Sequence, residues 1–244
     1  MEKDQRYEIV ENLDQYRIGI DDVFAFKCRE CGKCCRDRED ILLNSRDVYN
    51  IATTLNLTHE QVIEKYCEVY IGQESQIPVV RLMPKGPNRN CPLLKGDRCL
   101  VHSMKPTVCA LFPLGRVVSS EHAPEDAGFS RPYEIEYILN KATCGSLKRK
   151  QTVRSWLEMF SISADDQFFI EWNKAVFKII TTVKQYKGRP FVTDKVMEMM
   201  WGAIFSALYA DYDTSKDFYL QFQDNITKIT NVFSKLEVVA NGLV

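Results

Sequence analysis

The sequence contains no apolar run of the roughly 18 residues that a membrane-spanning helix needs. Its most apolar long stretch, residues 170–183, is interrupted by Glu171, Lys174 and Lys178. The first residues, MEKDQRYEIVENLDQ, are charged throughout and show no basic segment followed by an apolar one, so we expect no secretory signal. These absences favour a cytoplasmic protein with no membrane partner, and cytoplasmic thiols stay reduced.

The chain also lacks an excess of charge of either sign. Its 32 Lys and Arg residues offset 33 Asp and Glu residues, which leaves a net charge of −1. Without a strong positive field, we expect no nucleic-acid partner. The one local basic run, Lys148-Arg149-Lys150, is more typical of the solvated start of a helix.

Cysteine and proline almost disappear from the second half of the chain. All nine cysteines lie at or before Cys144, and Pro190 is the only proline after residue 150. The sequence therefore predicts an α+β fold with two regions. A small cysteine-rich metal-binding module with short strands and helices covers residues 1–148, and an all-helical C-terminal region covers residues 149–244.

Local patterns predict the elements of both regions. We expect strands over 40–44, 77–83, 114–118 and 133–139, and helices over 46–55 and 59–69. Thr58 and Gln61 match a capping box for the second of these helices, and Pro106 opens a short helix that contains Cys109. Apolar residues at helical spacing predict three more helices, over 164–187, over 193–210 and from Thr214 through Phe233.

The residue that the sequence has in excess is cysteine. The stretch FKCRECGKCC places Cys28, Cys31, Cys34 and Cys35 within eight residues. The first three form C-x2-C-x2-C, which opens the cluster-binding run of bacterial ferredoxins and also contains the C-x2-C of structural zinc sites. Gly32 permits the positive φ that a chain wrapping around a metal centre often needs. The pattern indicates a metal site but does not choose the metal.

Four further cysteines lie downstream at Cys91, Cys99, Cys109 and Cys144. Eight thiols suffice for two four-thiolate sites, or for one cluster with spare ligands. Neighbouring Cys34 and Cys35 are not expected to direct both thiolates at one small ion. His102, three residues after Cys99, is a weaker candidate ligand. The ninth thiol, Cys67, falls near the end of a predicted helix and is expected in the core.

In these motifs the chain resembles the YkgJ-type cysteine-cluster family, also described as the CxxCxxCC or zinc- or iron-chelating domain. The likeness rests on FKCRECGKCC, on the SRDV and LNLTHEQV helix starts, and on CPLLKGDRCLVHSMKPTVCALFP, in that order, over about 24–145. It implies a metal centre. Flagellin lysine N-methylase-like proteins carry a related cysteine pattern, so the likeness also allows protein modification. However, the chain has no convincing Gly-rich strand–helix loop for S-adenosylmethionine and no radical-SAM C-x3-C-x2-C.

Three functions remain open at this point. The favoured one is a protein that holds an iron–sulfur cluster of the 4Fe–4S type, or iron, and works as a redox or electron-transfer component with a protein partner. The first alternative is a structural zinc module that presents a helical interaction domain. The second is a protein-modifying enzyme like the flagellin lysine N-methylases. No local signature supports a catalytic cysteine, so whether the chain is an enzyme stays open.

The ferredoxin-like spacing also suggests how the thiols are shared. By analogy with a ferredoxin loop closed by a distant Cys-Pro pair, we expect one centre to be bound by Cys28, Cys31, Cys34 and Cys91. The remaining metal-binding positions are then assigned to Cys35, Cys99, Cys109 and Cys144.

Overall fold

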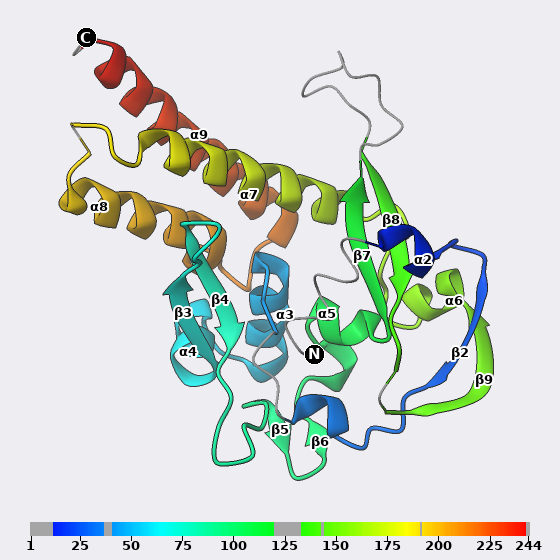
Figure 1. The fold of residues 1–244 in the computed structure, drawn as a ribbon. Helices are drawn as coiled ribbons and strands as arrows, with labels where there is room; N and C mark the ends of the chain where they lie inside the picture. Colours follow the sequence, from blue (N-terminus) through cyan, green and yellow to red (C-terminus); the bar gives the residue numbers. More distant parts are fainter. Residues whose placement is uncertain (1–11, 37–40, 120–132, 143, 191, 243–244) are drawn as a thin grey trace. The chain divides into compact units, whose positions relative to one another are not determined.

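The computed structural model describes residues 12–36, 41–119, 133–142, 144–190 and 192–242 (Figure 1). The fold is α+β, with short antiparallel strands and a helical C-terminal region, as the sequence predicts. No helix in these ranges is long and apolar enough to cross a membrane. The charged N-terminal residues 1–11, from which no signal segment is expected, lie outside the described residues.

The chain divides into two compact units, and each is built from two separate stretches. Unit 1 consists of Met1–Ile41 and Pro84–Asn173, and unit 2 consists of Leu42–Met83 and Lys174–Val244. The chain therefore passes between units after residues 41, 83 and 173. The boundary predicted between residues 148 and 149 lies inside unit 1 instead.

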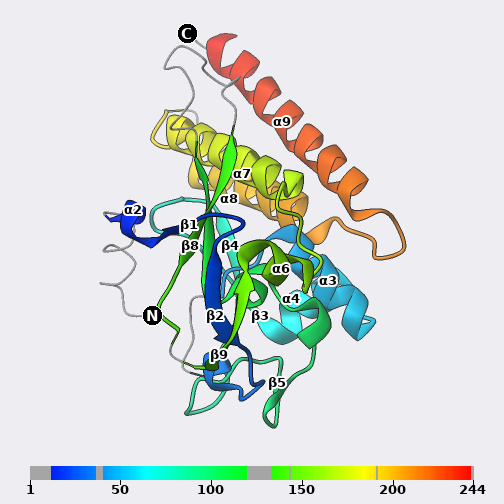
Figure 2. The same ribbon diagram turned by 90° about the vertical axis from the view of Figure 1, so that its right-hand side faces the viewer.

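Unit 1 contains a three-stranded antiparallel sheet and a two-stranded ribbon (Figure 2). The sheet has the order β1-β8-β7, formed by β1 (Arg17–Ile18), β8 (Glu134–Leu139) and β7 (Leu114–Ser119). The ribbon pairs β2 (Val23–Lys27) with β9 (Ser146–Thr152). The smaller elements of the unit are α2 (Leu13–Tyr16), η1 (Lys33–Cys35), β5 (Leu94–Lys95), β6 (Arg98–Cys99), η2 (His102–Met104), α5 (Thr107–Leu111) and α6 (Val153–Glu158).

The ribbon was not predicted, and it organises the core of unit 1. Phe24 and Phe26 alternate onto the buried face of β2, where both rings meet Trp156 of α6 edge to face. The Trp156 indole nitrogen donates a hydrogen bond of 3.0 Å to the carbonyl oxygen of Leu111. The run 148–150 lies in β9, so the helix start predicted there is wrong, although its side chains are exposed as expected.

The helix predicted over 164–187 begins later than expected. Helix α7 covers Gln167–Tyr186 and starts in unit 1. Asp166 accepts a hydrogen bond of 3.4 Å from the backbone N–H of Phe169. The Asp166 carboxylate also pairs with Arg116 of β7 at 2.8 Å, and both side chains are nearly inaccessible to solvent. A buried carboxylate held in this way fixes where the first turn of the helix can begin.

Unit 2 combines a β-hairpin with helices (Figure 1). Besides the rest of α7, its elements are α3 (Ser45–Leu55), α4 (His59–Tyr66), β3 (Cys67–Ile71), β4 (Pro78–Leu82), α8 (Asp194–Phe205), the π-helical turn η4 (Ser206–Ala210) and α9 (Phe218–Gly242). The capping box of Thr58 and Gln61 is confirmed. The predicted strand over 77–83 is also confirmed as β4. Asp40, in the strand predicted over 40–44, lies outside the described residues, and Leu42 forms a single β-bridge with Arg81.

Cys67 is buried, as predicted, but it does not lie on a helix. Helix α4 ends at Tyr66, three residues before the predicted end, and Cys67 opens β3 opposite Leu82 of β4. The thiol side chain lies in the core of unit 2 with 7% of its surface exposed. It therefore belongs to the hairpin and not to the cysteine-rich part of the chain.

A buried histidine lies at the centre of unit 2. His59 is fully inaccessible to solvent, and its ring stacks on Tyr212 with a centroid distance of 5.1 Å. Its Nδ1 atom lies 3.0 Å from the carbonyl oxygen of Tyr209, while Nε2 has no hydrogen-bond partner among the residues that the structure describes. Burial lowers the pKa of His59, and the Tyr209 carbonyl and the nearby Glu60 carboxylate only partly oppose this effect.

We expect the His59→Phe variant to lose part of the pH dependence of folding stability. The wild-type protein loses stability as the pH falls below about 6.5, because unfolding lets His59 take up a proton that the folded protein excludes. At pH 7.5 the variant should be less stable by about 1 kcal/mol, since the bond to Tyr209 is gone. Urea titrations at pH 7.5 and 5.5 should show this gap closing; a constant gap would contradict the assignment.

Candidate metal centre

The FKCRECGKCC segment leaves strand β2 and turns back on itself. Phe26 anchors its start in the core with 1% of its surface exposed. Gly32 adopts φ 64°, as its predicted role in the turn requires, and Glu30 also has a positive φ of 52°. The backbone N–H of Glu30 donates to Cys28 Sγ at 3.4 Å. The turn therefore both reverses the chain and supplies a hydrogen-bond donor to the first thiol.

The two neighbouring cysteines of the segment lie in the short helix η1. Cys34 Sγ and Cys35 Sγ are 4.0 Å apart. Two thiolates on one tetrahedral ion with metal–sulfur bonds of about 2.3 Å are separated by about 3.8 Å. The observed spacing is one that a single ion could bridge, which the sequence does not predict for adjacent residues.

The Cys35 end of the segment lies beside the β5–β6 hairpin. The backbone N–H of Cys91 donates to the carbonyl oxygen of Cys35 at 2.7 Å. Cys99 pairs with Leu94 across the hairpin. Arg36 forms an ion pair of 2.5 Å with Asp97 at the hairpin turn. These contacts bring Cys35, Cys91 and Cys99 to one side of the loop.

The raised pKa of Cys35 agrees with this placement and indicates that a further thiol, Cys109, is also nearby. The pKa of Cys35 is raised, first by its hydrogen bond with Cys34, then by burial, and then by the charges of Cys34, Cys91 and Cys109. Cys109 lies on α5, the short helix that the sequence predicts after Pro106. Cys35 therefore lies within electrostatic reach of Cys34, Cys91 and Cys109.

Cys144 also lies beside this segment, where it is hydrogen-bonded to Cys34. Lys27 is paired with Ser146 in the β2–β9 ribbon, so the residues just beyond this pair approach each other. Gly145 is so close to β2 that a Cβ atom there would touch the Phe26 ring and lie 2.9 Å from the Lys27 carbonyl oxygen. Burial raises the pKa of Cys144 to about 11, and the charges of Cys34, Cys31 and Cys28 add to this shift.

Backbone N–H groups moderate the cost of ionising the partly buried thiols. Burial raises the pKa of Cys91 to about 11, while hydrogen bonds from the backbone of Leu93 and Leu94 act in the opposite direction. Burial also raises the pKa of Cys99, against a bond from Val101 and the charge of Lys105. Such thiols bind a proton at neutral pH, and a metal ion can bind them by displacing that proton.

The donor set fits a soft metal. Eight thiols belong to unit 1, and Cys67 alone belongs to unit 2. Thiolates select zinc, iron or iron–sulfur clusters over magnesium or calcium. Within the described ranges, no three His, Cys, Asp or Glu side chains lie as close together as the ligands of a bound metal ion. His102 lies in η2, where its Nε2 is 4.0 Å from Glu30 Oε1.

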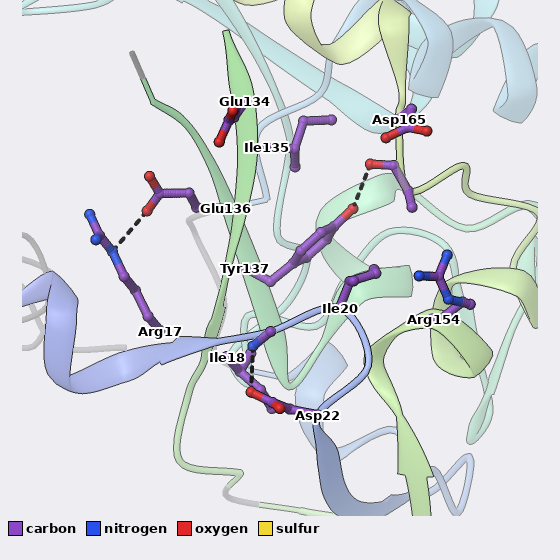
Figure 3. Close-up of a pocket in the computed structure, with 12 residues that line it drawn as sticks. Arg17, Ile18, Ile20, Asp22, Glu134, Ile135, Glu136, Tyr137, Arg154 and Asp165 are labelled. Carbon is purple, nitrogen blue, oxygen red and sulfur yellow. Dashed lines mark hydrogen bonds and ion pairs between the residues drawn. The ribbon is translucent and has the colours of Figure 1, made fainter. Parts of the chain in front are cut away.

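Unit 1 also contains a polar cavity that sequence reasoning missed (Figure 3). Its volume is about 650 Å³, and Arg17 and Glu136 form an ion pair of 2.8 Å at its edge. The hydroxyl of Tyr137 donates to the carbonyl oxygen of Ala164 at 3.2 Å. Since the lining side chains come from β1, β8, α6 and the segment before α7, no local pattern in the sequence marks this cavity.

An α+β fold with eight thiols in one unit defines a metal-binding protein of the cysteine-cluster class. The family model CxxCxxCC, described as a "putative zinc- or iron-chelating domain", matches residues 27–150, which is half of the chain. The protein belongs to this family, so the resemblance seen in the sequence is confirmed. The comparison with curated proteins and the comparison with solved structures each found no match.

We expect the Gly145→Ala variant to disturb the Cys28 end of the site. Gly145 has φ 83° and no room for a Cβ beside Phe26 and the Lys27 carbonyl. The matched control is Gly86→Ala, where φ is 71° and nothing lies within 4 Å of the new Cβ.

The control should cost about 1 kcal/mol of unfolding free energy, from the backbone conformation alone. The Gly145→Ala variant should cost about 2 kcal/mol more, because overpacking adds to the strain. Urea denaturation of both variants measures the difference, and equal losses would refute the close approach of Gly145 to β2.

Proposed function

We propose that unit 1 binds an iron–sulfur cluster, or iron, through its cysteine thiolates and serves in electron transfer with a protein redox partner. The carrying observation is the gathering of eight thiols in unit 1, in which the charge of Cys34 acts on Cys91, Cys99 and Cys144. A bound cluster would supply one-electron chemistry, at a potential set by its hydrogen bonds and exposure.

The residues of the chain would tune such a centre. The N–H of Glu30 donates to Cys28, and the N–H groups of Leu93 and Leu94 act on Cys91. Hydrogen bonds to ligand sulfur stabilise its negative charge and raise the reduction potential. We also place the protein in a reducing compartment such as the cytoplasm, because thiols that bind a metal must stay reduced.

The contacts also favour a particular division of the thiols. The ferredoxin spacing predicts that Cys91 completes the set of Cys28, Cys31 and Cys34, and this set stays a prediction. The β2–β9 register and the close approach of Gly145 support Cys144 as the fourth member instead. The second group then contains Cys35, Cys91, Cys99 and Cys109, with Cys34 between the two groups.

A structural zinc site is the second candidate. The 4.0 Å between Cys34 Sγ and Cys35 Sγ is close to the separation of two ligands on one tetrahedral ion, which a mononuclear zinc site requires. In that case the metal would stabilise the fold of unit 1. The helices of unit 2 would then interact with a protein partner.

Metal analysis of the protein purified without air distinguishes these candidates. We expect a brown protein with iron and acid-labile sulfide in equal amounts, and a visible absorption band that bleaches on reduction. A colourless protein with stoichiometric zinc would favour the second candidate. A folded protein with neither metal would overturn both.

Single cysteine variants test the division of the thiols. We expect Cys144→Ser to lose the metal of the Cys28 group, because the hydroxyl is a poor ligand for a soft ion. Cys67→Ala is the matched control and should keep the full metal content, since Cys67 lies in the core of unit 2. A Cys144→Ser protein with unchanged metal content would return Cys91 to the first group.

A further inference from the structure

A cavity of about 310 Å³ opens next to Cys28 in unit 1. One side of it is apolar and the other is charged. The apolar side is formed by Phe26, Trp156, Met159 and Phe160, and the polar side includes Lys27, Glu30, His102 and Arg149. The cysteine-cluster pattern does not account for this cavity. Because Arg149 and Cys28 both line it, the basic run 148–150 reaches the edge of the thiol site.

The apolar side is anchored in the core of unit 1. The rings of Phe26 and Trp156 are 5.5 Å apart at 78°, and those of Trp156 and Phe160 are 5.3 Å apart at 71°. Both Phe26 and Trp156 are almost fully buried, and the indole nitrogen is bound to the carbonyl oxygen of Leu111. Phe26 and Trp156 therefore fix the position of Phe160, and the apolar surface open to a ligand ring belongs to Phe160, which is partly buried, and to Met159, which is exposed.

The polar side carries an excess of positive charge. Lys27 and Arg149 are contributed by the paired strands β2 and β9 and are both exposed. Lys105 extends over the Phe160 ring, with its Nζ atom 4.4 Å from the ring centroid. Among the described lining residues Glu30 is the only carboxylate, and its Oε1 lies 4.0 Å from His102 Nε2. That nitrogen is shielded from solvent and has no hydrogen-bond partner within the described part of the chain.

We propose that this cavity binds a small aromatic carboxylate. The ring would pack against Met159 and Phe160, and the carboxylate would pair with Arg149 and Lys27. A guanidinium group recognises a carboxylate with two parallel hydrogen bonds, which fixes its orientation. A ligand held there would lie against Cys28, at the edge of the metal site. The proposal goes beyond the proposed function and does not depend on which metal is bound.

A competing explanation is that these cations serve only to neutralise the thiolates. Lys105 does act on Cys99 in this way, since its charge lowers the pKa of that thiol. The two explanations differ in what Arg149 affects. As a ligand-binding residue it governs carboxylate affinity, and as a counter-charge it governs metal retention.

Calorimetric titration of the purified protein, with its metal content measured in the same sample, tests the proposal. Benzoate, benzyl alcohol and benzylamine carry the same ring with different charge, and acetate carries the charge without the ring. We expect benzoate to bind at least tenfold more tightly than the alcohol and acetate, and benzylamine not to bind. Equal binding of the alcohol, the amine or acetate, or no binding of benzoate, would overturn the proposal.

Two variants locate the site. Arg149→Gln should weaken benzoate binding at least tenfold, whereas Lys148→Gln, which removes a neighbouring cation that does not line the cavity, should not change it. Phe160→Ala should weaken binding as well, with an unchanged circular dichroism spectrum. If Arg149→Gln lowers the metal content but leaves benzoate affinity intact, the cations are counter-charges and the proposal fails, whatever metal the protein holds.

Discussion

The pairing of β2 with β9 is the constraint on which the rest of unit 1 depends. It joins Val23 to Thr152 and Lys27 to Ser146, residues that are far apart in the chain. The same pairing presses Phe26 against Trp156 and leaves no space for a side chain at Gly145. The core of unit 1, the thiol site and the cavity next to Cys28 therefore all depend on this one short ribbon. A change in the register of its two strands would disturb all three.

The thiol site is a compromise between burial and charge. Burial keeps the thiols protonated, and the crowding of their charges has the same effect. Backbone N–H groups near Cys91 and Cys99 act in the opposite direction without adding a mobile charge. A soft cation relieves both costs at once, because it replaces the protons and neutralises the thiolates. The site is therefore suited to a metal and poorly suited to remain an ionised cluster without one.

Local signals in the sequence predicted the local parts of the fold. The capping box at Thr58, the strand over 77–83 and the short helix after Pro106 each depend on a few neighbouring residues. The β2–β9 ribbon could not be predicted in this way. Residues 147–150 of β9 are all exposed, so they show no alternation of buried and exposed side chains, and β2 lies over a hundred residues earlier in the chain. For the same reason, the sequence identified the eight thiols of unit 1 but not the proximity of Cys144 to Cys28.

The interleaving of the two units has a consequence for synthesis on the ribosome. Cys28 emerges more than a hundred residues before Cys144, and all of Leu42–Met83, a stretch of the other unit, is made between them. At ordinary translation rates this interval lasts on the order of ten seconds. During that time the first four thiols lack the strand that completes their surroundings. The order of synthesis therefore delays assembly of the thiol site until β9 has left the ribosome.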